Sequence, residues 1–160
     1  MTDHRPYTAL QIALHWLVAL LVVATWFLGD GMGRLLHQKL DGTYTGGTPL
    51  HVVLGLSVLA VVAIRVVVRL MQGAPAAPEG TTGTHAQARH WGHLAIYALL
   101  VLVPLGGLSA WYLGLGEAGD IHALAANALL IIAGLHAAMA LWHQYVRHDG
   151  TLMRMLKPGA

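Results

Sequence analysis

Residues 121–145 read IHALAANALLIIAGLHAAMALWHQY, and this stretch decides the fold. It is apolar over the length of a membrane-spanning helix, yet it contains His122 and His136, fourteen residues apart. An α-helix advances about 1.5 Å and 100° per residue, so the two imidazoles lie ~21 Å apart, within about 40° of one face. Ionisable side chains in such a helix are energetically unfavourable and usually functional. The stretch therefore predicts one membrane helix that carries two polar sites at different depths.

The composition is that of a membrane protein. Only 10% of the 160 residues are charged and 56% are hydrophobic, whereas a soluble domain carries about 25% charged residues. We therefore predict that residues 1–160 form a single membrane domain. The absence of cysteine excludes disulfides, iron–sulfur ligation, thiolate zinc sites and covalently attached haem. The small excess of nine Lys and Arg over seven Asp and Glu is typical of a membrane topology signal, so no nucleic-acid partner is expected.

Three further apolar segments are long enough to cross a hydrocarbon core of about 30 Å. Together with residues 121–145 they predict helices at about 8–28, 50–71 and 91–113. The fold class is therefore an all-α transmembrane four-helix bundle, embedded in the lipid bilayer. The segment 29–49 is predicted to be a Gly- and Thr-rich loop with a short interfacial turn at about 35–40. Residues 72–90 are predicted to be a linker, and residues 114–120 a short turn. Because the last of these is so short, the third and fourth helices should be antiparallel neighbours.

The basic residues predict the orientation. With both termini on one side, that side holds seven of the nine: Arg5, Arg65, Arg69, Arg89, Arg147, Arg154 and Lys157. The opposite loops hold two bases and four acids, which gives a formal charge of −2: Arg34, Lys39, Asp30, Asp41, Glu117 and Asp120. Cytoplasmic loops of membrane proteins carry the excess of Lys and Arg, so both termini are predicted to be cytoplasmic.

The depths of four histidines match in pairs. His51 and His122 each lie near the outer end of their helix, so they share an outer layer. His15 lies about thirteen residues, or ~20 Å, from the outer end of the first helix, and His136 lies ~21 Å below His122. These two share an inner layer. The sequence thus predicts two histidine pairs, one above the other.

Two neutral imidazoles that face each other across a bundle are typical of the axial ligands of a haem iron. Zinc usually takes a third protein ligand in tetrahedral geometry, and neither layer has an obvious one. A haem iron with two axial histidines has no position open for O₂, so such a site transfers electrons. An alternative is a haem-free bundle that handles metal ions. Such a protein would show no reduced-minus-oxidised absorption bands of the b type.

Two arginines of the second helix have two possible roles. Arg69 is eighteen residues after His51, which is five helical turns and therefore the same face. An arginine can bind a carboxylate through two hydrogen bonds, so Arg65 or Arg69 could hold a propionate of the inner haem, with Arg65 the better candidate. Alternatively, both extend toward lipid phosphate at the cytoplasmic surface.

The remaining histidines are weaker candidates. His143 is seven residues after His136 on a similar face, but it lies near the cytoplasmic end and matches the depth of His15 less well. His93 opens the third helix and is predicted to be an interfacial residue or a polar contact of the inner haem. Whether either contacts haem stays open. The others are predicted to be solvated surface residues: His4, His37, His85, His90 and His148.

Several motifs resemble one family over nearly the whole chain. The first helix contains Tyr7-x-x-x-Gln11-Ile-Ala-Leu-His15-Trp16-Leu, and the third contains Gly92-His93-Leu-Ala-Ile-Tyr97. The second helix contains His51 and Gly55, and it ends with the motif Arg65-x-x-x-Arg69. The fourth contains His122-x13-His136-Ala-Ala-x-Ala, and the segment after it contains Asp149-Gly-Thr-Leu-x-Arg154-Met. Together these motifs resemble the bacterial cytochrome b561 family.

The resemblance implies a di-haem b-type cytochrome of the bacterial inner membrane that exchanges electrons with ubiquinone. It implies two haem b groups, with His15 paired with His136 and His51 paired with His122. Some members of the family are superoxide oxidases. Others are electron-carrying partners of dehydrogenases or soluble cytochromes.

Two functions follow as expectations. The first is a quinone oxidoreductase that moves electrons between a periplasmic-side donor, either superoxide or quinol, and the ubiquinone pool. The second is an electron-transfer anchor subunit, which a periplasmic electron donor protein or dehydrogenase reduces. Superoxide fits less well, because the loop at 114–120 is much shorter than in the superoxide-oxidising members and a formal charge of −2 does not attract an anion. Arg34 and Lys39 could still form a local basic patch.

Overall fold

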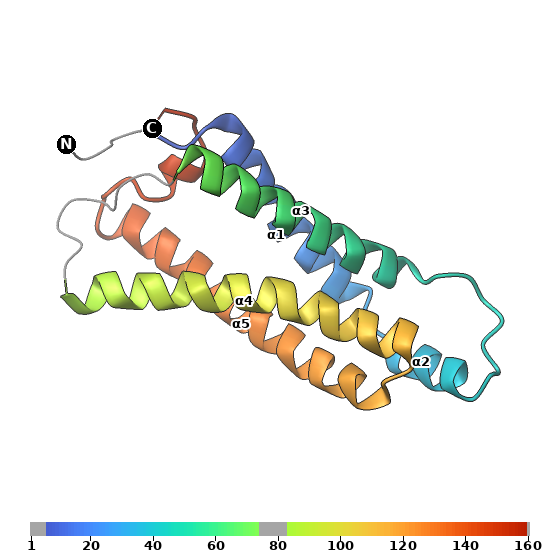
Figure 1. Ribbon diagram of the computed structural model, residues 1–160. Coiled ribbons are helices and arrows are strands. Elements are labelled where there is room, and N and C mark those ends of the chain that lie inside the picture. Colours follow the sequence, from blue (N-terminus) through green and yellow to red (C-terminus); the bar gives the residue numbers. More distant parts are fainter. Residues whose placement is uncertain (1–5, 74–82, 160) are drawn as a thin grey trace.

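The computed structural model describes residues 6–73 and 83–159, and Figure 1 shows the chain as a bundle of helices. In chain order the elements are α1 (Ala9–Phe27), α2 (Met32–Leu40), α3 (Leu50–Gln72), α4 (Gly83–Leu113), α5 (Gly116–Tyr145) and the 3₁₀ helix η1 (Met153–Met155). The described residues contain no strand. The predicted all-α class is confirmed.

Four helices are long and apolar enough to cross a membrane: α1, α3, the part of α4 from His90 onward, and α5. They are the four predicted spans. The first two begin and end within one residue of the expected bounds. Capping explains the start of α1, because the Thr8 side chain accepts a hydrogen bond from the Gln11 backbone and the Gln11 side chain accepts one from the Thr8 backbone.

The other helix bounds differ from the predicted ones. Helix α4 begins at Gly83, eight residues before the expected position, and α5 begins at Gly116, so the predicted seven-residue turn is reduced to two residues. Gly114 allows this sharp reversal because its φ is +70°. Both helices begin in polar sequence outside the apolar spans. The spacing of apolar residues does not indicate a helix there, so these helix starts were not predicted. Residues 74–82 of the predicted linker lie outside the described residues.

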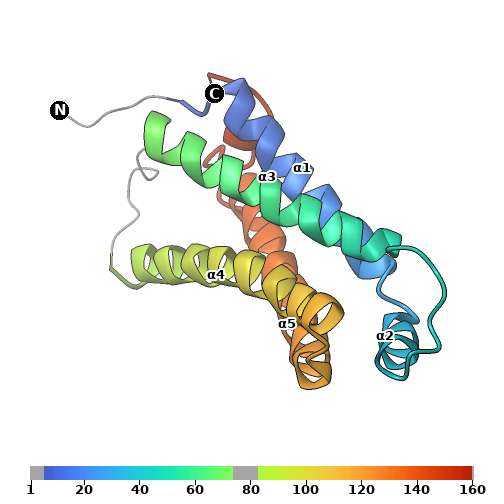
Figure 2. The same ribbon diagram turned by 45° about the vertical axis from the view of Figure 1, so that its right-hand side comes forward.

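The nine-residue helix α2 replaces the expected short turn at about 35–40. It is amphipathic, and its apolar side packs on the start of α5. There Leu36 lies over Gly119 and Leu40 over Gly114 and Gly116, where glycines leave room for the leucine side chains. Figure 2 shows α2 at one end of the bundle, which we call the α2 end.

The bundle consists of two antiparallel helix pairs. Helix α1 packs along α3 and α4 along α5, while α3 and α4 join the pairs (Figures 1 and 2). The shared core is formed by Val18, Val58, Val62, Leu100, Val103 and Leu129. The most extensive contacts do not include α1 with α5, so these two helices are linked mainly through individual side chains.

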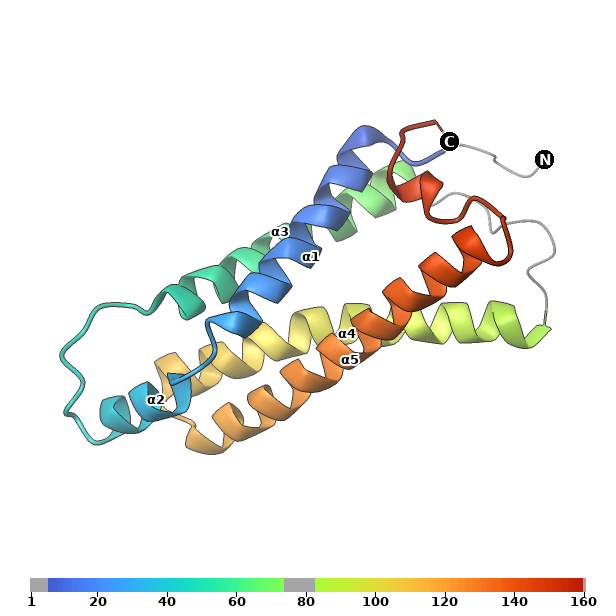
Figure 3. The same cartoon turned by 180° about the vertical axis from the view of Figure 1, so that it is seen from behind.

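The opposite end of the bundle, which we call the terminal end, gathers α1, α3 and the C-terminal segment (Figure 3). The indole Nε1 of Trp16 donates to the Met155 carbonyl at 2.7 Å. Gln11 Nε2 donates to the Gly73 carbonyl at 3.0 Å, and Thr8 Oγ1 donates to Gln72 Oε1 at 2.9 Å. These contacts place the start of α1 and the last turns of the chain on one side of the bundle.

Candidate functional site

His51 of α3 and His122 of α5 face each other near the α2 end. Their ring centroids are 5.9 Å apart and the rings are perpendicular, with an interplanar angle of 90°. The two helices belong to different pairs of the bundle, so only the tertiary fold brings these rings together. This is the outer pair expected from the sequence.

Hydrogen bonds select the tautomer of both rings in this pair. Nδ1 of His51 lies 2.9 Å from the Thr25 carbonyl oxygen, and Nδ1 of His122 lies 2.7 Å from the Val103 carbonyl oxygen. A carbonyl oxygen only accepts, so each Nδ1 carries the proton and donates. Each Nε2 is then left with a free lone pair, which is the form in which histidine binds a metal. The backbone of α1 and α4 thus orients the two rings.

Glycine leaves space for the His122 ring. A Cβ atom at Gly107 would lie 2.9 Å from Cε1 and 3.0 Å from Nδ1 of His122. Side chains do not pack at such distances, so any residue other than glycine at this position would displace the imidazole. The neighbouring Gly106 differs, because its Cβ would lie 3.6 Å from the Cβ of His122, an ordinary contact.

A cavity of about 780 Å³ surrounds the His51–His122 pair. Its wall is mostly apolar and is built from α1, α3, α4 and α5, with α2 across the α2 end. Its polar lining residues are Thr25, Asp30, His37, His51, Trp26, Trp111, Asp120, His122 and Asn127. A large apolar cavity with a few convergent polar groups is typical of a cofactor site.

His15 of α1 and His136 of α5 form the second pair, nearer the terminal end. Their ring centroids are 6.4 Å apart with an interplanar angle of 61°. His93 of α4 also contacts this pair, with its centroid 5.1 Å from that of His136. The inner layer expected from the sequence therefore contains a third imidazole.

Arg65 contacts the inner pair directly. Its Nη2 lies 3.0 Å from Nδ1 of His15, and its guanidinium lies 5.5 Å from the centroid of the Tyr97 ring. A guanidinium only donates, so Nδ1 of His15 accepts here and the ring proton is on Nε2. Binding of a metal through Nε2 of His15 would therefore require Arg65 to turn away from the ring.

The spacing of the rings can be compared with that of two ligands on one metal ion. Imidazole nitrogens bind a metal at about 2.0–2.1 Å and lie about 1.1 Å from their ring centre, so two rings on opposite sides of one ion have centroids roughly 6.3 Å apart. The observed separations of 5.9 and 6.4 Å fit this arrangement. Among the described residues, no group of three or more His, Asp or Glu side chains is arranged to hold a metal ion. The two imidazoles of each pair are thus spaced so that they could bind one metal ion from opposite sides.

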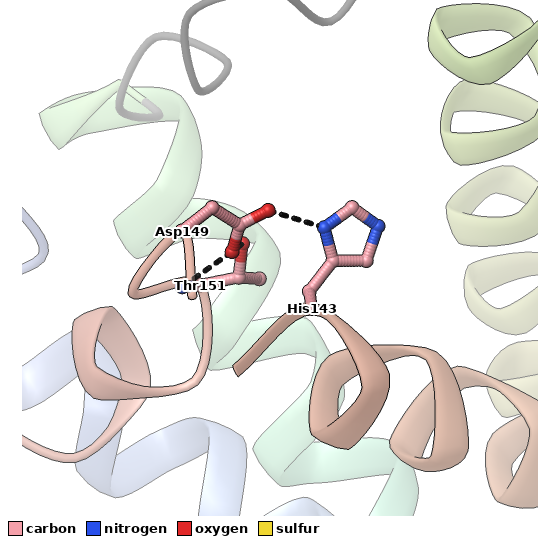
Figure 4. Close-up of polar contacts among 3 residues, drawn as sticks. All are labelled: His143, Asp149 and Thr151. Atoms are coloured by element: carbon pink, nitrogen blue, oxygen red, sulfur yellow. Dashed lines mark hydrogen bonds and ion pairs between the residues drawn. The ribbon is translucent and has the colours of Figure 1, made fainter. Parts of the chain in front are cut away.

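His143 has a different partner. Its Nδ1 contacts Oδ2 of Asp149, and Oδ1 of Asp149 accepts from the Thr151 hydroxyl at 2.7 Å and backbone N–H at 3.1 Å (Figure 4). The contact joins the last turn of α5 to the C-terminal segment. Sequence reasoning did not identify this partner, although Asp149 lies only six residues after His143.

The same reasoning overlooked Asn127. This amide lies in the middle of α5 and lines the cavity. Its Oδ1 accepts a hydrogen bond from Trp26 Nε1 of α1 at 3.0 Å. An amide within an apolar membrane span is itself a signal that could have been used.

The contact at Asp149 predicts the behaviour of the C-terminal segment. Burial raises the pKa of the Asp149 carboxyl, but the hydrogen bonds from His143 and Thr151 together outweigh burial and bring the pKa from 3.8 down to about 2. Because the folded pKa is the lower one, the contact stabilises the segment fully above about pH 4 and is lost as the pH falls toward about 2. We expect trypsin to cleave slowly after Arg154. The cleavage rate, relative to that of an unstructured peptide at the same pH, should not change from about pH 6 to 8. Cleavage should be several-fold faster in Asp149→Ala.

Mass spectrometry of timed digests would measure this cleavage. Thr151→Val is the matched control, because it keeps the His143 contact and the backbone hydrogen bond to Asp149. Equal cleavage of Asp149→Ala and the unmodified protein would contradict the proposed anchoring.

Comparison with known proteins gives matches over nearly the whole chain. The family described as prokaryotic cytochrome b561 matches residues 6–158. The sequence is 41% identical to cytochrome b562 of Cereibacter sphaeroides, over 99% of each chain. It is 30% identical to cytochrome b561 homolog 2 of Escherichia coli K12, over 94% of this chain and 90% of that protein. It is 29% identical to the probable superoxide oxidase CybB of Yersinia pestis, over 96% of this chain and 97% of that protein.

Proposed function

This chain belongs to the prokaryotic cytochrome b561 family, and from this premise we propose that it is a di-haem quinone oxidoreductase. It is a multi-pass b-type cytochrome of the bacterial inner membrane, with a role in electron transfer. In the proposed function, electrons move between a donor at the periplasmic side and the ubiquinone pool. The α2 end faces the periplasm and both termini face the cytoplasm, as the distribution of basic residues favours.

The observation that carries this proposal is the pairing of four histidines across the bundle. His51 and His122 would hold one haem b and His15 and His136 the other, with ring separations that suit two axial ligands. Both pairs use α5, so a single rigid helix sets the distance between the two sites. The apolar cavity at the outer pair suits a large planar macrocycle.

The residues of the chain determine what such sites can do. Haem b, when bound, supplies an iron that gains or loses one electron. If both histidines of a pair held the iron, no position would remain for O₂, and the site would be restricted to electron transfer. Hydrogen bonds from His51 and His122 to backbone carbonyls hold the rings in one orientation, and the apolar wall keeps bulk water out.

Arg65 is proposed to bind a propionate of the inner haem. Its guanidinium lies beside His15 and over Tyr97, so a short rotation would release Nδ1 of His15 and direct the guanidinium at a carboxylate. Such a contact would provide a charge-assisted, bidentate partner. It would also free His15 to take the tautomer that binds a metal through Nε2.

The second candidate function is a membrane anchor that a partner protein reduces. Two carboxylates, Asp30 and Asp120, line the outer cavity, while none of its described lining residues is Lys or Arg. Lys39, one of the two bases on this side, lies over the Trp111 ring at 4.9 Å. This charge pattern favours a cationic protein donor over the superoxide anion. The similarity to a probable superoxide oxidase supports superoxide, so both donors enter the test.

Stopped-flow absorption of the purified holoprotein tests the proposed function. We expect ubiquinol to reduce the b-type bands within the mixing experiment, and ubiquinone to reoxidise them. Reduction by superoxide would identify the donor. If neither quinol nor superoxide reduces the protein, while a co-purifying dehydrogenase or cytochrome does, the oxidoreductase proposal is wrong and the anchor function replaces it.

A further inference from the structure

Asn127 is a polar side chain at a depth where polar side chains are unfavourable. It lies five residues after His122 on α5, which is about 7.5 Å further along the helix. Its side chain is exposed and lines the same cavity as His51 and His122. Hydrocarbon supplies no hydrogen-bond partners, so an amide left without them there destabilises the protein. The amide therefore requires partners from the protein or from a ligand.

Of the two polar atoms in the Asn127 amide, only the oxygen Oδ1 has a hydrogen-bond partner among the described residues. The indole N–H of Trp26 can only donate, so the atom that it meets at 3.0 Å is the carbonyl oxygen Oδ1. The amide nitrogen Nδ2 then carries two N–H donors. Neither donor has a partner among the residues that the structure describes. The unpaired donors require an acceptor that is not part of the protein.

The surroundings of Asn127 indicate how an acceptor could arrive. Asn127 and Ala123 of α5, with Trp26 and Phe27 of α1, form one wall of the cavity. These side chains are themselves exposed at the lipid-facing surface, Trp26 to 41% and Phe27 to 69%. Helices α1 and α5 are not among the closely packed helix pairs. An opening between them would let an apolar molecule dissolved in the lipid reach the amide.

We propose that Asn127 and Trp26 form a quinone-binding site beside the outer histidine pair, in which Nδ2 of Asn127 donates to a quinone carbonyl. The inference rests on the proposed function and assigns a binding site to the quinone of that function. A quinone headgroup is planar and apolar with carbonyl acceptors, which matches an apolar wall, an indole and an unpaired amide donor. The Trp26 hydrogen bond holds the amide with Nδ2 free.

The amide binds the headgroup but takes no part in proton transfer, because it does not ionise near neutral pH. Reduction of the quinone to the quinol takes two electrons and two protons. The electrons are those that the proposed function delivers, one at a time. The protons come from water at the mouth of the cavity, where Asp30 and Asp120 line the wall.

Substitution of Asn127 by leucine tests this site. Leucine has a similar volume but no donor, so we expect the holoprotein to keep both haems and its dithionite-reduced spectrum. Loss of one neutral hydrogen bond should raise the KM for ubiquinol about three- to tenfold. Trp26→Phe, which frees the amide to rotate, should raise this KM less. Ser109→Ala is the matched control, because the Ser109 hydroxyl is already bonded to the Leu105 carbonyl at 2.8 Å.

The outcomes separate the inference from the function on which it rests. If the unmodified protein exchanges electrons with ubiquinol and Asn127→Leu does so with an unchanged KM, the site is wrong and the proposed function stands. If Asn127→Leu loses haem, the amide serves the cofactor and the site is again wrong. If the unmodified protein does not react with ubiquinol at all, the proposed function fails first.

A second measurement needs no variant. Pulsed electron paramagnetic resonance of the one-electron-reduced ubiquinone bound to the unmodified holoprotein should detect coupling to an amide nitrogen. The nuclear quadrupole parameters of a side-chain amide differ from those of an imidazole. A bound radical coupled only to imidazole nitrogen would overturn the assignment to Asn127.

Discussion

Substitution of His122 by alanine is expected to remove one of the two proposed haems and leave the other. The substitution deletes an axial ligand whose position depends on the Val103 carbonyl and the space at Gly107. Among the described residues, the ring contact of His51 with another histidine is the one with His122, and the substitution removes it. The haem-to-protein ratio should halve, as should the reduced-minus-oxidised b-type bands. His136→Ala should produce the same loss at the inner site.

His143→Ala is the matched control for both substitutions. It removes a histidine from the same helix, but its Nδ1 partner is Asp149 and not another histidine (Figure 4). We expect this variant to keep both haems. Retention of both haems in His122→Ala would contradict the outer pair. Loss of the inner haem in His143→Ala, but not in His136→Ala, would move that ligand to position 143.

Gly107→Val is expected to weaken haem binding at the outer site although no ligand is changed. The new Cβ would lie 2.9 Å from Cε1 and 3.0 Å from Nδ1 of His122, so the imidazole must rotate away and lose its hydrogen bond to the Val103 carbonyl. Overpacking of this kind destabilises a site by about 1–3 kcal/mol. Haem affinity at the outer site should therefore fall about 5- to 150-fold, since 1.4 kcal/mol corresponds to a factor of ten.

Titration of haem into the apoprotein, read as the absorption of the low-spin b-type species, measures this affinity. Gly106→Ala is the control, because its Cβ would make only an ordinary 3.6 Å contact with His122. It should bind both haems as the unmodified protein does. Equal outer-site affinity in Gly107→Val and Gly106→Ala would mean that the ring does not occupy the observed position when haem is bound.

The membrane spans could be read from the sequence because burial in lipid depends on length and apolarity, which are local properties. The same is true of depth, since an α-helix converts residue number into distance along its axis. His51 with His122, and His15 with His136, could therefore be paired before any contact was known. The structure brings both pairs to within 6.4 Å between ring centroids.

The helix ends could not be read in the same way. Residues 83–90 and 116–120 are helical although they are polar, because they extend beyond the apolar spans, where periodicity no longer reports on burial. Helix α2 is stabilised by leucines that pack on glycines of another segment. A pattern search within one segment does not detect such contacts.

The partners of individual polar atoms belong to the tertiary structure alone. The local sequence around His51 contains no sign of the Thr25 carbonyl, which is 26 residues away, and that around Asn127 contains no sign of Trp26, which is 101 residues away. Likewise, the local sequence around Arg65 does not indicate its contacts with His15 and Tyr97. Local composition and helical periodicity thus specify four apolar helices and the levels of four histidines. The histidine tautomers, the space around the His122 ring and the unpaired donors of the Asn127 amide depend on which helices lie side by side. That arrangement is determined only when the whole chain has packed.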